Sequence, residues 1–430
     1  MVVYATRRRG WRWLAALGCA LFGSCAGIFQ RSAPAVPQEY AVRQDAHSPL
    51  RVGSAERDIT PPLGSYLAGF GMARGSESVG SPLRVRALVL EQDGRRFAIV
   101  GVDNLGLMRE DTDWIKAGLS GFANGDVFLC SSHTHAGPDA IGLWGHYLLN
   151  SGRDRDYIGV VRTATAAAVA EALTNAAPAQ LRRGGGRLPP QGLVKNSNRP
   201  ECFDRRVVVL HAQALDDGRP LGTLLHLACH PEVLPRRSTA LSADFVGALC
   251  DEWRSRGHGQ AVFVNGALGA MISPQGQSRD LAGVQTFGAT ACAIAEQALA
   301  TAEPVPVDAI EVRRRDVYVP MESLGFRLGQ LTMALQRQLF DGTARSTVGW
   351  LRIGTFEAVA LPGEMEPALA ERVRAELRRP NLVLFGLCDD ELGYLLREQD
   401  ARDPEYHYER TVSACLRAGE IVRAALTGRR

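Results

Sequence analysis

The chain has 430 residues, 46% of them hydrophobic and 22% charged. This is ordinary globular composition, and the length fits one large domain or two ordinary ones. The formal net charge is +3, but four of the 49 basic residues and none of the 46 acidic ones fall within the first 25 residues. The remaining chain is therefore nearly neutral, which argues against nucleic acid as a partner.

Residues 1–25 are predicted to form a signal segment. The basic stretch RRRGWR precedes WLAALGCALFGSCAGIF, an uncharged apolar run of 17 residues that is short for a membrane span. This order predicts export to the bacterial periplasm or outer envelope. Cys25 follows LFGS as a lipidated cysteine would, so a lipid anchor with peripheral membrane contact is a second interpretation, and a short uncleaved anchor is a third. Residues 26–50 are predicted to be a linker, and 51–430 a single domain.

Within this domain, short β-type runs alternate with Ala-rich segments of helical spacing. No internal repeat or low-complexity boundary divides it. Runs that often end in Gly, Pro, Asn or Ser predict strands over 84–92, 96–104, 126–132, 205–213, 221–230, 261–267, 356–363 and 381–388. Helices are predicted over 156–176, 286–302, 365–379 and 411–428. Many strands and fewer helices indicate an α/β fold in which helices cover a mixed β-sheet core.

Residues capable of metal or proton chemistry follow several of these strands. They are His133, His135, His230, Ser273, Glu364 and Tyr394. In open α/β sheets, ligands bind beyond the carboxyl ends of the strands, and loops on a rigid scaffold carry the chemistry. The sequence therefore predicts a functional site at the C-terminal ends of the strands.

His, His and Glu are the ligand set of a catalytic zinc ion. Each motif also has an ordinary explanation, because a His-x-His pair is more often structural and Glu364 can serve the N-terminus of the following helix. The joint placement favours a metal site. His133 and His135 lie one residue apart and would point to opposite faces of an extended chain. We therefore predict that His133 binds metal and His135 faces the substrate, unless the chain turns between them.

Several blocks along the chain resemble the neutral/alkaline non-lysosomal ceramidase family, specifically its N-terminal catalytic domain. The resemblance runs from about Val52 to the C-terminus, and the order of the blocks is that of the family. They are ERDITPPLG, SPLRVRALVLEQ, SSHTHAGPD, KNSNRP, HLACHPEVL, LSADFVG, ALPGEM, GLCDDELGY and YHYE. The resemblance implies a zinc-dependent amidohydrolase that cleaves the N-acyl amide bond of ceramide or a related lipid amide.

The resemblance also implies roles for individual residues. His133, His230, Glu364 and Tyr394 would hold Zn²⁺. His135 and Arg199 would line the reacting amide, and Ser273 would correspond to the serine of the family's reaction centre. Zinc would supply Lewis acidity and activated water. Arg199 or the Tyr394 hydroxyl would stabilise charge on the carbonyl oxygen, and His135 would protonate the leaving amine.

The sequence departs from the family in three places that concern the substrate rather than the metal. GAMISPQ has Ala270 in place of an Asp and one extra residue before Ser273. DAIGLWGHYLL after the histidine pair looks unlike the long ceramidases, although its Trp144–Leu149 stretch suits one wall of an acyl groove. The C-terminal β domain of the long members finds no match, so a short bacterial-type member is predicted.

Other interpretations remain open. A serine hydrolase is the first, although no Gly-x-Ser-x-Gly motif occurs. A metal-dependent hydrolase of another ester or amide on the same scaffold is the second. A non-catalytic envelope protein is the third. Asp244 is interpreted either as a hydrogen-bond partner of a histidine or as a cap of its own loop.

Overall fold

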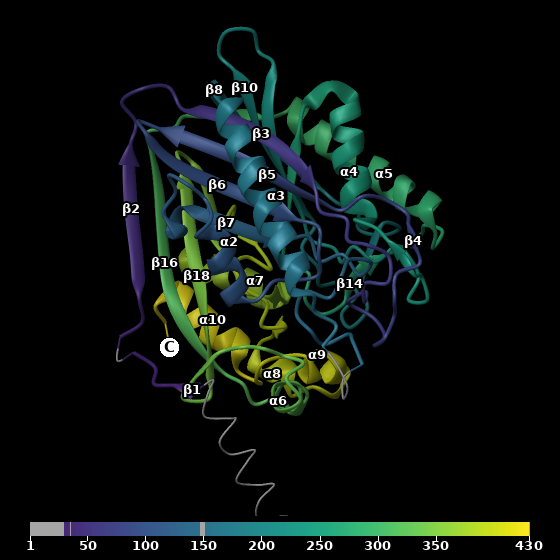
Figure 1. Ribbon diagram of the computed structural model, residues 1–430. Coiled ribbons are helices and arrows are strands. Elements are labelled where there is room, and N and C mark those ends of the chain that lie inside the picture. Colours follow the sequence, from purple (N-terminus) through teal and green to yellow (C-terminus); the bar gives the residue numbers. More distant parts are fainter. Residues whose placement is uncertain (1–29, 35, 147–150, 430) are drawn as a thin grey trace, which may run out of the picture.

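The computed structural model describes residues 30–34, 36–146 and 151–429. The predicted signal segment and Cys25 lie outside the described residues. Two large β-sheets pack face to face, and helices cover their outer faces (Figure 1). This arrangement confirms the predicted α/β fold with mixed sheets and covering helices.

One sheet has nine strands in the order β13-β11-β10-β8-β3-β5-β6-β7, with β15 paired to β8. The pairs β6–β7 and β11–β13 are parallel and the other pairs are antiparallel. The strands are β3 (Arg51–Asp58), β5 (Arg84–Gln92), β6 (Arg95–Val102), β7 (Val127–Ser131), β8 (Ala177–Arg187), β10 (Arg206–Ala214), β11 (Pro220–Leu227), β13 (Ala261–Asn265) and β15 (Glu303–Val305).

The other sheet has seven strands, with β1-β17-β18-β16-β2 in order, β19 beside β18 and β21 beside β19. They are β1 (Gln30–Arg31), β2 (Glu39–Asp45), β16 (Ala309–Pro320), β17 (Leu339–Phe340), β18 (Thr343–Ile353), β19 (Phe356–Ala360) and β21 (Val383–Phe385). The linker predicted over 26–50 is wrong for Glu39–Asp45, which pairs with β16 at the sheet edge (Figure 1). Its residues alternate between exposed and half-buried, so it lacks the apolar alternation that marks a buried strand.

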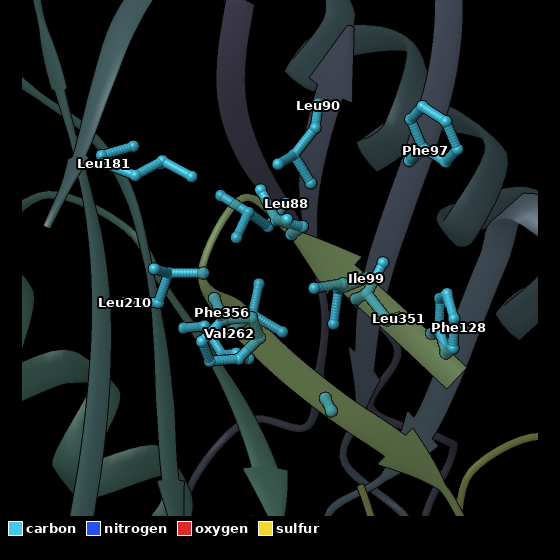
Figure 2. Close-up of a cluster of buried hydrophobic side chains, with 14 of the residues drawn as sticks. Leu88, Leu90, Phe97, Ile99, Phe128, Leu181, Leu210, Val262, Leu351 and Phe356 are labelled. Carbon is cyan, nitrogen blue, oxygen red and sulfur yellow. The ribbon is translucent and has the colours of Figure 1, made fainter. Parts of the chain in front are cut away.

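The central core lies between the two sheets. Leu88, Phe97 and Ile99 of the nine-stranded sheet meet Leu351 and Phe356 of the seven-stranded sheet (Figure 2). Alternate residues of β6 point the other way, so that Ala98 and Val100 pack toward α3 (Arg155–Thr174). This period-2 alternation lets one strand serve two apolar layers.

Helices close the outer faces. Helix α3 covers β3 and β5 (Figure 1), and α4 (Asp244–Trp253) and α5 (Leu281–Ala300) cover the β8–β13 side of the same sheet. On the seven-stranded sheet lie α7 (Pro367–Leu377) and α10 (Ala418–Thr427). The remaining helices in the described part of the chain are α2 (Arg109–Lys116), η2 (Asn124–Asp126), η3 (Arg254–His258), α6 (Leu324–Leu331), α8 (Glu398–Ala401), η4 (Pro404–Tyr406) and α9 (His407–Thr411). Among the described residues, no helix combines the length and apolarity needed to cross a bilayer.

Three two-stranded pairs lie outside the large sheets. Strand β20 (Glu364–Met365) runs parallel to β22 (Tyr394–Leu395), and β14 (Ile272–Pro274) is antiparallel to β9 (Val194–Asn196). The third pair joins β4 (Ser78–Val79) and β12 (Ala240–Leu241). The first two pairs carry three of the predicted site residues, namely Glu364, Tyr394 and Ser273.

Candidate metal centre

Three buried histidines converge beyond the strand ends of the nine-stranded sheet. His133 and His135 follow β7, and His230 follows β11. One ring nitrogen from each lies within 4.8 Å of the others, and the ring centroids are 5.1 to 5.6 Å apart. The cluster is of a kind that holds a metal ion, and it lies where the sequence predicted a site.

The chain turns sharply at His133, whose φ is +73°. Strand β7 ends at Ser131, and the N–H groups of His133 and Thr134 both donate to the Asn104 carbonyl. The expectation that His133 and His135 point to opposite faces is therefore wrong. That expectation assumed an extended chain, whereas a left-handed residue brings both rings to one side.

His133 and His230 present their Nε2 atoms to one carboxylate. The Nδ1 of His133 donates to the Leu105 carbonyl at 2.7 Å, and that of His230 to the Ile272 carbonyl at 2.8 Å. Their Nε2 atoms lie 3.5 and 3.0 Å from Glu364 Oε2. With Nδ1 protonated, the neutral ring offers a lone pair at Nε2. Two imidazole nitrogens that converge on one carboxylate oxygen form a donor set that fits a metal ion.

Tyr394 stands beside Glu364, because the two residues are register partners in the β20–β22 pair. Its buried hydroxyl donates to Met271 Sδ at 3.4 Å. Burial raises the pKa of Tyr394 well above its ordinary value, and the Glu364 carboxylate adds to this. Burial would also raise the pKa of Glu364, but His133 and His230 outweigh it and lower that pKa.

His135 is tied to Ser273 through Glu232, a residue that the sequence analysis did not single out. Glu232 Oε2 lies 3.4 Å from His135 Nδ1, within ion-pair range but without hydrogen-bond geometry. Glu232 Oε1 accepts a short hydrogen bond from the Ser273 hydroxyl. Burial, with His133 and His230 close by, lowers the pKa of His135 well below its ordinary value. The only indication of Glu232 in the sequence was its position, because it follows His230 by two residues.

Two other predicted residues have different partners. Arg199 makes a short ion pair with Asp400, lies over the Tyr406 ring, and is not among the residues that line the cavity described below. The Asp244 carboxylate accepts the N–H groups of Val233 and Leu234. The structure therefore shows Asp244 capping its own loop.

A cavity of about 80 Å³ opens on the centre. His133, His135, Glu364 and Tyr394 lie along it, and so do two further polar residues, Arg337 and Glu391, that the sequence analysis did not assign. Its other walls are mainly apolar. They are Gly69, Leu105, Ile141, Leu143, Trp144, Met321, Phe326, Leu335, Leu392, Gly393, Tyr408 and Val412. Trp144, expected as part of an acyl-groove wall, thus lines the cavity, whereas residues 147–150 lie outside the described residues.

The chain matches no model of a known protein family and no curated protein at a significant level. Its fold does match solved structures. A neutral ceramidase from Pseudomonas aeruginosa aligns with a TM-score of 0.71 at 16% identity, covering 88% of this chain and 74% of that one. A ceramidase complexed with C2 aligns with a TM-score of 0.73 at the same identity and coverages. The resemblance seen in the sequence is thereby confirmed at the level of the fold.

Proposed function

We propose that the protein is a zinc-dependent amidohydrolase that cleaves the N-acyl amide bond of ceramide or a related lipid amide. The observation that carries this proposal is the meeting of the Nε2 atoms of His230 and His133 with Glu364 Oε2, 3.0 and 3.5 Å away, at an apolar cavity. The fold likeness to ceramidases supports the reaction class.

Zinc is proposed to be held by His133, His230, Glu364 and Tyr394. Imidazole nitrogens and carboxylate oxygens suit this ion, and the tyrosine is placed beside the glutamate. When bound, zinc supplies Lewis acidity and activated water. The two backbone carbonyls behind the histidines fix the ring tautomers, as is usual for metal-binding imidazoles.

The neighbouring side chains are proposed to manage the proton and the substrate. His135 lies beside both proposed histidine ligands and lines the cavity, so it is suited to deliver a proton to the leaving amine. Glu232 holds Ser273 and faces His135. Arg199 is paired with Asp400, which favours Tyr394 over Arg199 as a donor to the carbonyl oxygen.

The apolar walls favour a lipid-like amide. Leu143, Trp144 and Phe326 line the cavity together with other apolar residues, and such surface gains free energy when it covers hydrocarbon. About 80 Å³ accommodates the reacting group and its nearest atoms, since one water molecule occupies about 30 Å³ in the liquid. The rest of a long acyl chain would extend beyond this volume.

Export to the periplasm or outer envelope is a separate proposal that rests on the sequence of residues 1–25 alone. Fractionation of cells that express the full chain tests it. Incorporation of a labelled fatty acid into the wild type but not into a Cys25→Ala variant would distinguish a lipid anchor from simple cleavage.

The decisive experiment pairs metal analysis of the purified protein with an N-acylsphingosine hydrolysis assay. We expect about one zinc per chain, with both zinc and activity lost in His133→Ala. His258→Ala is the matched control, because this partly exposed histidine pairs with Glu296 and is not part of the histidine cluster.

The other outcomes separate the alternatives. Zinc without turnover would retain the metal site and indicate a different ester or amide. Turnover that resists a chelator would indicate a serine hydrolase. A protein that binds no metal and cleaves nothing would support a non-catalytic envelope role.

A further inference from the structure

Glu391 gives the apolar cavity an acid that the proposed metal centre does not use. It lines the cavity with Arg337. One guanidinium nitrogen of Arg337 makes a short ion pair with Asp390, and another donates to the Glu391 backbone carbonyl at 3.3 Å. Arg337 is thus committed to Asp390 and the main chain rather than to the Glu391 carboxyl group.

One oxygen of Glu391 lacks a protein partner. Oε1 accepts the Gly393 N–H at 2.7 Å, whereas Oε2 is buried and has no hydrogen-bond partner among the described residues. Leaving a buried polar atom unpaired costs roughly 1–3 kcal/mol, and buried polar groups in native proteins nearly always find a partner. An unpaired oxygen on a cavity-lining residue therefore points to a ligand.

The backbone makes room for this side chain. A Cβ atom at Gly106 would lie 2.8 Å from Cγ of Glu391 and 3.2 Å from Oε2. Gly106 follows Leu105, whose carbonyl accepts His133 Nδ1. The fold thus seats Glu391 against the same loop that orients a proposed zinc ligand.

The environment of Glu391 favours its neutral form. Burial raises its pKa well above the ordinary value. A neutral carboxyl group donates as well as accepts, which suits a hydroxyl partner. Because Glu391 lines the same cavity as His133 and Tyr394, such a hydroxyl would lie close to the amide at the metal centre.

We propose that Glu391 is a specificity residue that hydrogen-bonds a hydroxyl group close to the scissile amide. The preferred substrates are then N-acyl amino alcohols rather than N-acyl alkylamines. This inference rests on the proposed amidohydrolase function and narrows its substrate class. N-acylsphingosine fits, because the carbon that bears its amide nitrogen is flanked by two hydroxyl-bearing carbons.

The test compares kcat/KM for N-acylsphingosine and for its 1-deoxy and 3-deoxy analogues. We expect the wild type to prefer the full substrate over at least one analogue by about 10- to 100-fold, as the loss of one buried hydrogen bond predicts. In Glu391→Leu, the ratio of kcat/KM for the full substrate to that for the analogue should fall close to one. The zinc content should not change. Glu391→Gln should keep most of it, because an amide also donates and accepts.

Two further variants support this test, one as a second way to remove the Glu391 contact and one as a control. Gly106→Ala adds a methyl group that displaces the Glu391 side chain, so this variant should also lower the preference for the full substrate. It tests the role of Glu391 even if Glu391→Leu does not fold. Glu303→Leu, an exposed glutamate on β15, should leave the preference unchanged.

An unchanged preference in folded Glu391→Leu and Gly106→Ala would overturn the role of Glu391 and leave the amidohydrolase proposal standing. A zinc-loaded wild type that cleaves none of the three amides would overturn the proposed function itself, and this inference with it.

Discussion

At the scale of single residues, Glu232 links two side chains to which the sequence assigned chemistry. One of its carboxylate oxygens accepts from Ser273, and the other lies 3.4 Å from His135 Nδ1. A carboxylate beside an imidazole attracts the ring and thereby favours one ring orientation. Glu232 is therefore placed to keep the His135 ring turned toward the proposed zinc ligands.

Glu232→Ala is expected to lower kcat/KM for the amide substrate by about 10- to 100-fold, and Glu232→Gln by less, because the amide oxygen still accepts from Ser273. Zinc content should change little. A double-mutant cycle with Ser273→Ala checks the linkage, since residues in one hydrogen-bond network couple by about 0.5–3 kcal/mol. Strictly additive effects of the two substitutions would show that Glu232 and Ser273 act independently.

The sequence predicted which residues come together better than it predicted where their side chains point. His133 and His230 meet Glu364, and Tyr394 lies beside Glu364, although the strands that precede the histidines and those that precede Glu364 and Tyr394 belong to different sheets. The orientation of His135 was missed, because the left-handed φ of His133 belongs to a non-glycine residue and leaves no sequence signal. The ion pair of Arg199 with Asp400, 201 positions away, was not predicted, because a single sequence does not reveal such long-range pairs.

At the scale of elements, Asn265 joins the two strand ends that carry the histidines. It is the last residue of β13, and it is fully buried. Its Nδ2 donates to the carbonyls of Ser132 and Cys229, at 3.0 and 2.8 Å. Its Oδ1 accepts the N–H groups of Cys229 and Gly266, at 3.1 and 3.0 Å. Ser132 and Cys229 immediately precede His133 and His230, so one side chain sets the spacing of the proposed ligands.

Asn265→Leu should lower the free energy of unfolding by about 3 kcal/mol or more, because several buried backbone groups lose a partner worth roughly 1–3 kcal/mol each. Zinc affinity, measured by competition with a chelating dye, should fall as well. Asn175→Ala is the control, since its side chain makes a single bond to the Ser54 carbonyl at 3.3 Å. Unfolding and zinc binding that both match the wild type would show that Asn265 does not position the strand ends.

Elements were predictable where apolar residues alternate on a buried face. All eight predicted strands and all four predicted helices overlap elements of the structure. Among the strands of the two large sheets, β1, β2, β3, β8, β15, β16, β17 and β18 were not predicted. In β16, the run Arg313-Arg314-Arg315 interrupts the apolar pattern, although Arg314 is buried through an ion pair with Asp389. Buried charged residues whose ion-pair partners lie far away in the sequence look like loop residues when only the sequence is known.

At the scale of the whole molecule, Asp389 ties the two sheets together. It accepts the N–H of Leu129 in β7 at 3.0 Å, and it makes a short ion pair with Arg314 of β16. Lys116, at the end of α2, lies 2.5 Å from the same carboxylate. All three charged side chains are buried. Removing one partner of such a cluster leaves a buried charge uncompensated, which costs about 3–5 kcal/mol.

This cluster predicts how stability responds to acid. Burial alone would raise the pKa of Asp389, but Arg314 and Lys116 outweigh it and lower that pKa to about 2, against about 3.9 in the unfolded chain. A group whose pKa is lower in the folded state stabilises the fold above its unfolded pKa. Here roughly 2 kcal/mol should be lost as the pH falls from about 5 to 2.

Asp389→Asn removes this titration and should destabilise the protein at pH 7 by about 3–5 kcal/mol. The difference in unfolding free energy between wild type and variant should then shrink as the pH falls from about 5 to 2, because the wild type alone loses the contribution of this carboxylate. Denaturant unfolding of both proteins across this range measures the difference. Asp217→Asn changes an exposed aspartate in the loop after β10. Its unfolding free energy should be almost the same as that of the wild type at every pH. A wild-type-to-variant difference that stays constant from pH 7 to 2 would mean that Asp389 does not stay ionised when buried, so its pairing with Lys116 and Arg314 would not be what joins the sheets.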